Sequence, residues 1–350
     1  MSKFKHWADL TPDEQETARR ARQDRLELAR QKLASGIEKL VASGRWRDYL
    51  KFQGKFHRYS FCNTFLILLQ RPDATLVASY KTWQKLGRQV RKDESGISIF
   101  VPLLTRAHAD SESRKHREAI EATDPKEVKT GNSGSWEPYL PDDHGMEQLV
   151  GFKIGHVFDV CQTDGTPVPQ EPVSLLQGDD AGLYQALTDF ARQVVKVDVV
   201  EVGEDVLPPR TNGECVYSSE GNPEHIHIKG SNPPRMKTKT LAHELGHALL
   251  HDESEYRAAS PRSLKELEAE SVAFVVLNNF GIDSGEYSFG YLATWGGGEE
   301  AVRSIQISGE RIRQAAHQVI TWIEELGGTP RLEEGIPVDM PAAERSLKER

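Results

Sequence analysis

Two histidines with a glutamate between them constrain this chain more than any other feature. They lie within residues 240–251, in the run His243-Glu244-Leu245-Gly246-His247. Residues four apart lie one above the other on an α-helix, so both imidazoles can bind one ion while Glu244 projects beside it toward a metal-bound water. Small and apolar neighbours such as Leu241 and Ala248 favour a buried helix. The pattern is typical of the hydrolytic centre of a zinc metallopeptidase.

Such a centre needs a third protein ligand, because zinc takes three and leaves the fourth position for water. One route is a ligand just beyond the helix, as in the metzincin pattern. The glycine that lets a metzincin chain turn back is replaced here by Leu250, and the ligand position carries Glu253. We therefore favour the other route, a carboxylate from a second helix.

Residues 263–277 supply that second helix, which is apolar enough to be strongly buried. Glu266 and Glu270 are four apart and share a face, whereas Glu268 points elsewhere. Glu266 also fits a solvated acidic first turn, which the helix dipole favours. Glu270 lies deeper among apolar neighbours, and a buried carboxylate needs a partner. These arguments favour Glu270 as the third ligand.

Length and composition indicate a soluble protein with two domains. The chain has 350 residues, more than one core usually holds, and is 37% hydrophobic and 28% charged. It has no apolar run near the roughly 20 residues that span a bilayer, and no signal peptide, so we expect a cytoplasmic protein. Its three cysteines, Cys62, Cys161 and Cys215, are far apart in the sequence and form no CxxC pair. We therefore expect each to be a small buried residue of a protein in a reducing compartment.

Charge is distributed unevenly along the chain. Residues 45–104 hold eleven Lys and Arg against four Asp and Glu, a net charge of +7, so the remainder of a total of −9 carries −16. The same block has ten aromatic residues. Cations suit phosphates and flat rings suit unstacked bases, so the block favours single-stranded nucleic acid as a partner. A small core with a solvated basic face has the same composition.

Periodicity and capping signals predict a mixed α+β chain. Thr11-Pro12-Asp13-Glu14 is a capping box that opens a charged helix to about residue 33, with a second helix to about residue 42. Residues 105–143 are polar and indicate a mobile loop. Helices are further expected at 63–70, 82–86 and 181–194, and strands at 75–80, 96–102, 151–159 and 197–202.

Residues 224–229 alternate like a strand directly before the predicted metal-binding helix. Zinc peptidases place there an edge strand that pairs with the substrate backbone, so we expect this segment to be an edge strand. His225 and His227 share one of its faces. At least one of them fits an exposed strand histidine with no role in chemistry.

The chain resembles a known family over most of residues 45–320. Residues 57–75, 80–92 and 97–102 are similar to the N-terminal single-stranded-DNA-binding domain of ArdC-type antirestriction proteins, and residues 157–169 resemble the end of that domain. The runs 243–247 and 268–274 are similar to the metallopeptidase domain of the same family and of ImmA/IrrE-type peptidases. Such proteins are encoded by mobile genetic elements.

The resemblance implies roles for particular residues. Glu270 lies four residues before Phe274, as the zinc-binding glutamate of the peptidase pattern does. One departure is Asp93, where family members commonly have glycine; an acid there weakens phosphate attraction. The residues that the resemblance assigns to DNA binding are Tyr59, Asn63, Lys81, Trp83, Arg88, Arg91 and Lys92.

The resemblance also implies a division into domains. The fold class is α+β, with a small single-stranded-DNA-binding domain followed by a zincin-like metallopeptidase domain that has an active-site helix and an edge strand. The predicted limits are a charged helical arm at 1–44, the DNA-binding domain at 45–170, the peptidase domain at 171–328 and a disordered tail at 329–350.

The expected mechanism follows from the motif and the resemblance. Zn²⁺ held by His243, His247 and Glu270 lowers the pKa of a bound water, and Glu244 acts as the general base for attack on a peptide carbonyl. An oxyanion donor is also required. The candidates, between which the sequence does not choose, are His225, His227, Tyr217 and Tyr256.

Three functions from different classes remain open. The first, which we favour, is a zinc protease that single-stranded DNA recruits and that cleaves an unidentified protein partner. The second is a protein that coats single-stranded DNA as it enters during plasmid or phage transfer, with a zinc site that serves structure or regulation. The third is a repressor-cleaving protease of the ImmA/IrrE type, in which the basic domain docks a protein.

Overall fold

A computed structural model of the chain describes residues 10–106, 147–168, 180–208, 210–251, 261–282 and 299–326. The chain divides into two compact units. Of the described residues, 10–30, 99–106 and 147–155 belong to the first unit, and 31–98 and those from 156 to 326 belong to the second. No helix among the described residues is long and apolar enough to cross a membrane. Most of the predicted loop at 105–143, the predicted tail, Glu253 and Tyr256 lie outside the described residues.

The N-terminal helix begins where the capping box predicts. The backbone N–H of Glu14 donates to the Thr11 hydroxyl at 3.2 Å, and the Thr11 N–H donates to the Glu14 carboxylate at 2.8 Å. These bonds satisfy two of the free donors that every helix start leaves. The helix, α1, then runs without a break over Pro12–Ser43, so the expected division into two helices is wrong.

A small α+β arrangement follows the first helices. Strands β1 (Val77–Ser79), β4 (Glu147–Asp159) and β3 (Ile97–Arg106) form a sheet in the order β1-β4-β3, and β2 (Arg88–Val90) pairs antiparallel with β5 (Thr163–Gly165). The short helix α4 (Tyr80–Lys85) connects β1 and β2. Trp83 on α4 packs with Ala78 and Val90 in a local core, which holds these elements together.

The second sheet corrects the prediction of an edge strand. Strand β8 (Pro223–Lys229) lies between β6 (Asp198–Val202), to which it is parallel, and β7 (Gly213–Tyr217), to which it is antiparallel. Residues 224–229 are therefore central, because β6 occupies one side and β7 the other. Among the described strands of this sheet, the edges are β6 and β7.

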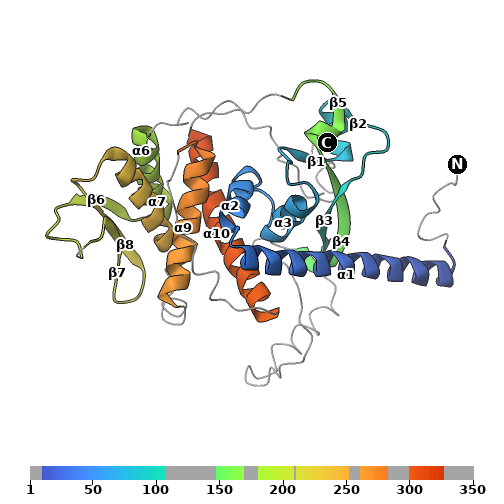
Figure 1. Cartoon of the computed structure of the whole chain (residues 1–350), viewed down its shortest axis with the longest axis horizontal. Coiled ribbons are helices and arrows are strands. Elements are labelled where there is room, and N and C mark those ends of the chain that lie inside the picture. The colour runs from blue at the N-terminus through green and yellow to red at the C-terminus, as the bar shows by residue number, and fades with distance from the viewer. Residues whose placement is uncertain are drawn as a thin grey trace, which may run out of the picture. The chain divides into compact units, whose positions relative to one another are not determined.

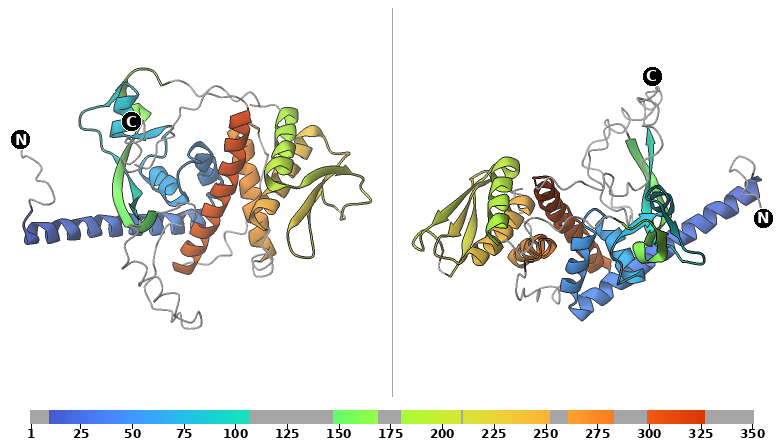
Figure 2. Two further views of the ribbon diagram at one scale, coloured as in Figure 1. Left: turned by 180° about the vertical axis from the view of Figure 1, so that it is seen from behind. Right: turned by 90° about the horizontal axis from the view of Figure 1, so that it is seen from above.

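Helices pack in layers behind this sheet. Figures 1 and 2 show α6 (Asp180–Phe190) and α7 (Pro234–Leu250) beside the strands, and then α9 (Arg262–Asn279) and α10 (Glu299–Leu326). A π-helical turn, Ala191–Val195, extends α6 and ends at Lys196, which is left-handed. The helix α10 had not been predicted, although buried residues such as Ile305, Ile312 and Val319 recur along it at helical spacing.

The helices α2 (Trp46–Lys55) and α3 (Phe61–Gln70) pack on α9 and α10 within the same compact unit. The Trp46 indole N–H donates to the Ser271 hydroxyl at 3.0 Å, and both side chains are buried. The N–H of Phe61, at the start of α3, donates to the Glu310 carboxylate of α10 at 2.7 Å. The first bond ties α2 to α9, and the second ties α3 to α10.

Candidate metal centre

The two motif histidines lie on α7 as their spacing predicts. Pro234 occupies the first turn of this helix, where its missing N–H costs no hydrogen bond. The Nε2 atoms of His243 and His247 are 3.1 Å apart, so both rings are directed at the same point. The hydroxyl of Tyr217 on β7 donates to the His247 carbonyl at 3.0 Å and ties the helix to the sheet.

Gly246 lets the second helix come close to these histidines. A Cβ at this position would lie 2.8 Å from Cα and 3.0 Å from the carbonyl oxygen of Ala269 on α9. Neither backbone atom can move without moving the helix. The glycine of the motif therefore sets the distance between α7 and α9.

The carboxylate nearest the histidines belongs to Glu266, not to Glu270. Its Oε2 lies 3.4 Å from Nε2 of His243 and 3.6 Å from Nε2 of His247, and the three side chains form a group that could hold a metal ion. Hydrogen bonds to both imidazoles lower the pKa of Glu266 well below its ordinary value. Two imidazole nitrogens and one carboxylate oxygen are the donor set of a catalytic zinc site, so these residues fit a divalent metal.

Glu270 lies one turn further along α9, on the same face. Partial burial raises the pKa of its carboxyl group, and its charge contributes to a raised pKa of His243. No hydrogen bond joins it to the histidines in the described structure, and the nearer carboxylate is that of Glu266. The sequence favoured Glu270 because of its apolar neighbours, but that burial is only partial.

Glu244 is buried next to the first histidine in the sequence of α7. It is 7% exposed, and burial raises the pKa of its carboxyl group to about 7, although the charge of His243 acts in the opposite direction. The backbone N–H of Cys215 on β7 hydrogen-bonds this carboxylate and fixes its direction. A carboxyl group with a pKa near neutrality can both accept and release a proton.

Of the expected oxyanion donors, the structure describes His225, His227 and Tyr217, and none of the three has a hydroxyl or ring nitrogen shown directed at the metal-binding group. His225 and His227 alternate with Ile226 and Ile228, which are fully buried, so the two histidines occupy the opposite face of β8. His227 Nδ1 pairs there with Glu214 at 3.1 Å. Tyr217 is close to α7, but its hydroxyl is engaged by the His247 carbonyl.

Three residues behind the histidines were not assigned from the sequence. His251, which caps α7, contacts His247 through its Nδ1 and Glu268 through its Nε2. Arg311 of α10 forms an ion pair with the same Glu268 carboxylate. A sequence signal did exist. His251 continues the four-residue spacing of His243 and His247, and a carboxylate on the far side of a buried helix, as Glu268 is, needs a partner.

Residues assigned to DNA binding divide into buried and exposed sets. Trp83 is fully buried, with its indole N–H donating to the Phe158 carbonyl at 2.8 Å, and Tyr59 and Asn63 are also buried. These three side chains stabilise the fold and present no ring or amide to a ligand. Lys81, Arg91 and Lys92 are exposed.

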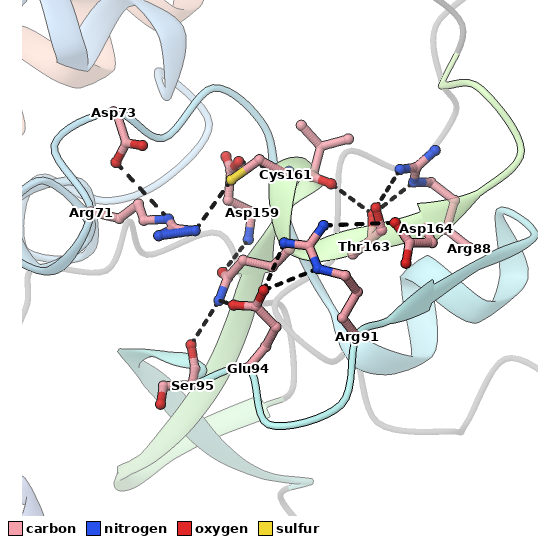
Figure 3. Close-up of polar contacts among 12 residues, drawn as sticks. Arg71, Asp73, Arg88, Arg91, Glu94, Ser95, Asp159, Cys161, Thr163 and Asp164 are labelled. Atoms are coloured by element: carbon pink, nitrogen blue, oxygen red, sulfur yellow. Dashed lines mark hydrogen bonds and ion pairs between the residues drawn. The ribbon is translucent and has the colours of Figure 1, made fainter.

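Arg88 and Arg91 are held by the polar contacts drawn in Figure 3. Arg88 donates to the hydroxyl and the carbonyl of Thr163, at 2.7 and 2.8 Å, and so pins β2 to β5. Arg91 pairs with Glu94 at 2.7 Å and lies 3.7 Å from Asp164. Both guanidinium groups are thus partly neutralised or committed to the fold.

The structure also explains the glycine expected at position 93 and corrects the burial expected for Cys161. Asp93 has a φ of 65°, in the left-handed region that glycine adopts without strain, which accounts for the glycine expected there from the resemblance. Cys161 is exposed rather than buried, and its Sγ accepts from Arg71 at 3.2 Å.

Two family models match this chain, one in each half of the sequence. Two histidines on one helix, with a buried glutamate between them in the sequence, and a carboxylate from a second helix form a group that could hold a divalent metal ion. The family model for the N-terminal domain of anti-restriction factor ArdC matches residues 27–133, and the IrrE N-terminal-like domain matches residues 204–277. These two matches confirm the resemblance to ArdC-type proteins: a segment similar to the ArdC N-terminal domain is followed by an IrrE-like segment.

Individual relatives are distant. An uncharacterized protein of Bacillus anthracis is 24% identical over 299 residues, which are 79% of this chain and 47% of that protein, so the chain spans about half the length of the curated relative. The metal-free crystal structure of the antirestriction ArdC protein of plasmid R388 is 17% identical and covers 85% of this chain and 97% of its own, with a TM-score of 0.45. The Mn(II)-bound structure is 16% identical and covers 85% and 99%, with a TM-score of 0.44.

Proposed function

We propose that the chain is a zinc-dependent metallopeptidase that binds single-stranded DNA through its ArdC-like domain and takes part in antirestriction. The observation that carries the enzymatic half is the convergence of three ligand atoms beside Glu244, whose carboxyl group has a pKa near neutrality. Two imidazoles and a carboxylate favour zinc among the divalent metals.

The chemistry that zinc supplies in such a site is Lewis acidity toward a water and a peptide carbonyl. Glu244 accepts the proton of the attacking water and delivers it to the leaving amine. The Cys215 N–H holds the carboxylate in place during both transfers. Among the described strands, β7, which carries Cys215, is an edge of its sheet, and an extended substrate can pair with such an edge.

The first test separates metal binding from catalysis. Glu244→Gln keeps the size of the side chain but cannot accept a proton, so it should retain zinc and lose peptide hydrolysis. The measurement is metal analysis together with cleavage of an unstructured protein such as casein. Loss of zinc from this variant, or undiminished hydrolysis, contradicts the role of Glu244.

We assign the third ligand to Glu266 because its carboxylate is nearest both Nε2 atoms. Glu266→Gln should then weaken zinc binding far more than Glu270→Gln, which is a matched change one turn away on the same face. The opposite ranking would restore Glu270, the residue that the sequence favours.

The DNA-binding half rests on an exposed group on α4 and the loop after β2. Tyr80 is 42% exposed, and its hydroxyl accepts from Gln89 at 2.5 Å, which holds the ring in place. The cations Lys81, Lys85 and Lys92 are exposed in the same segment. A fixed ring among lysines is what an unstacked base and its phosphates require. Tyr80 therefore replaces the buried Trp83 as the stacking candidate.

Binding of a fluorescent single-stranded oligonucleotide tests this assignment. Tyr80→Ala should cost about 1–3 kcal/mol of binding free energy through lost stacking. Lys81→Ala should reduce the slope of log K against log salt by about 0.7. Arg303→Ala, an exposed cation of α10, is the control and should change neither. Equal effects of all three changes would contradict a defined DNA surface.

A further inference from the structure

The ligand His247 has a second partner on the side away from the proposed metal. Its Nδ1 lies 2.9 Å from Nδ1 of His251, and Nε2 of His251 lies 3.0 Å from Oε2 of Glu268. His251 is 1% exposed and Glu268 is completely buried. Solvent therefore does not compete for either contact.

The far end of this chain of contacts is a charged pair from another helix. The Nε of Arg311 on α10 lies 3.8 Å from Oε1 of Glu268 on α9, and its Nη2 donates to the Leu250 carbonyl at the end of α7. One guanidinium thus links the three helices α7, α9 and α10. Its charge offsets that of Glu268, which would otherwise be costly to bury.

Metal binding fixes the position of every proton along this chain. The Nε2 of His247 faces the ligand group, so a bound metal uses its lone pair and the proton of the neutral ring lies on Nδ1. That N–H can only donate, so Nδ1 of His251 accepts. The proton of His251 then lies on Nε2, from which it donates to Oε2 of Glu268.

We propose that His251 is a positioning residue for the metal centre, and that Glu268 and Arg311 hold His251 in the tautomer this role requires. A ligand imidazole whose other N–H is hydrogen-bonded keeps its orientation and is a better donor to the metal. The three carboxylates of α9 thus have different tasks: Glu266 and Glu270 face the metal side, and Glu268 supports His247 from behind. This inference rests on the proposed metal site.

Variants of His251 test the proposal through zinc affinity, measured on the full chain by competition with a chromogenic chelator. His251→Phe removes the acceptor and should weaken zinc binding about 10- to 100-fold. His251→Asn places an oxygen near the position of Nδ1 and should restore part of the loss. Glu268→Gln should fall between wild type and His251→Phe. His225→Phe, on the opposite face of β8, is the matched control and should bind as wild type does.

A spectroscopic measurement on the wild-type chain keeps the test independent of folding. In zinc-loaded protein with ¹⁵N-labelled histidine, the ring nitrogen shifts should show the proton of His247 on Nδ1 and that of His251 on Nε2. A proton on Nδ1 of His251 overturns the proposal, as does a folded His251→Phe variant with unchanged zinc affinity. A wild-type chain that binds no zinc overturns the metal centre itself, and the positioning role with it.

Discussion

Gly246 offers the sharpest test of how α7 and α9 create the site. Replacing a helix-interior glycine by alanine ordinarily stabilises a protein by about 1 kcal/mol, because alanine has the higher helix propensity. At Gly246 the new Cβ would lie 2.8 Å from Cα of Ala269, a backbone atom that a side-chain rotation cannot clear. Overpacking of this kind costs about 1–3 kcal/mol, so the helices must separate.

The expected result for Gly246→Ala is a net loss of up to about 2 kcal/mol in the free energy of unfolding of the metal-free protein, measured by urea denaturation. Zinc affinity should fall as well, because Glu266 moves away from the histidines. Gly54→Ala in α2 is the control, because its new Cβ would meet nothing closer than 3.7 Å. This variant should raise the free energy of unfolding by about 1 kcal/mol. If both variants are equally stabilised, the close approach at Gly246 is refuted.

Three further predictions concern other parts of the fold. Asp93→Gly should raise the free energy of unfolding by about 1 kcal/mol in urea melts, because its φ of 65° strains a side chain; an unchanged midpoint would contradict this. Trp46→Phe should cost about 1–3 kcal/mol by leaving the buried Ser271 hydroxyl without its donor, and a neutral effect would show that the bond is dispensable. Burial, with the charge of His317 and nearby arginines, lowers the pKa of His57 to about 3, so the unfolded chain takes up this proton first. Stability should then fall between pH 6.5 and 3 by up to about 1.4 kcal/mol per pH unit, and His57→Asn should flatten that slope in urea titrations.

Local spacing was enough to predict the parts of the site that lie on one helix. His243, Glu244 and His247 have the positions that four-residue periodicity requires, because one helix fixes their directions. The carboxylate of a second helix depends also on how that helix is rotated and how closely it packs. Glu266 and Glu270 share a face, so sequence periodicity cannot rank them, and only the packed structure shows that Glu266 lies nearer.

The second feature that the sequence could not predict was the pairing between segments that lie far apart along the chain. The alternation in 224–229 predicted a strand, but its central place depends on β6 arriving in parallel and on β7, a segment without strong alternation. The same holds for Trp83. Its residue type suits a DNA-binding surface as well as a core, and only the packing against Ala78 and Val90 distinguishes them.

Zinc titration of the full chain tests the central claim most directly. The wild-type protein should bind one zinc ion per chain in competition with a chromogenic chelator, and Glu266→Gln should bind at least about 10-fold more weakly, because one of three ligands is lost. A wild-type chain that binds no zinc, or a Glu266→Gln variant with wild-type affinity, would contradict a metal centre formed by His243, His247 and Glu266.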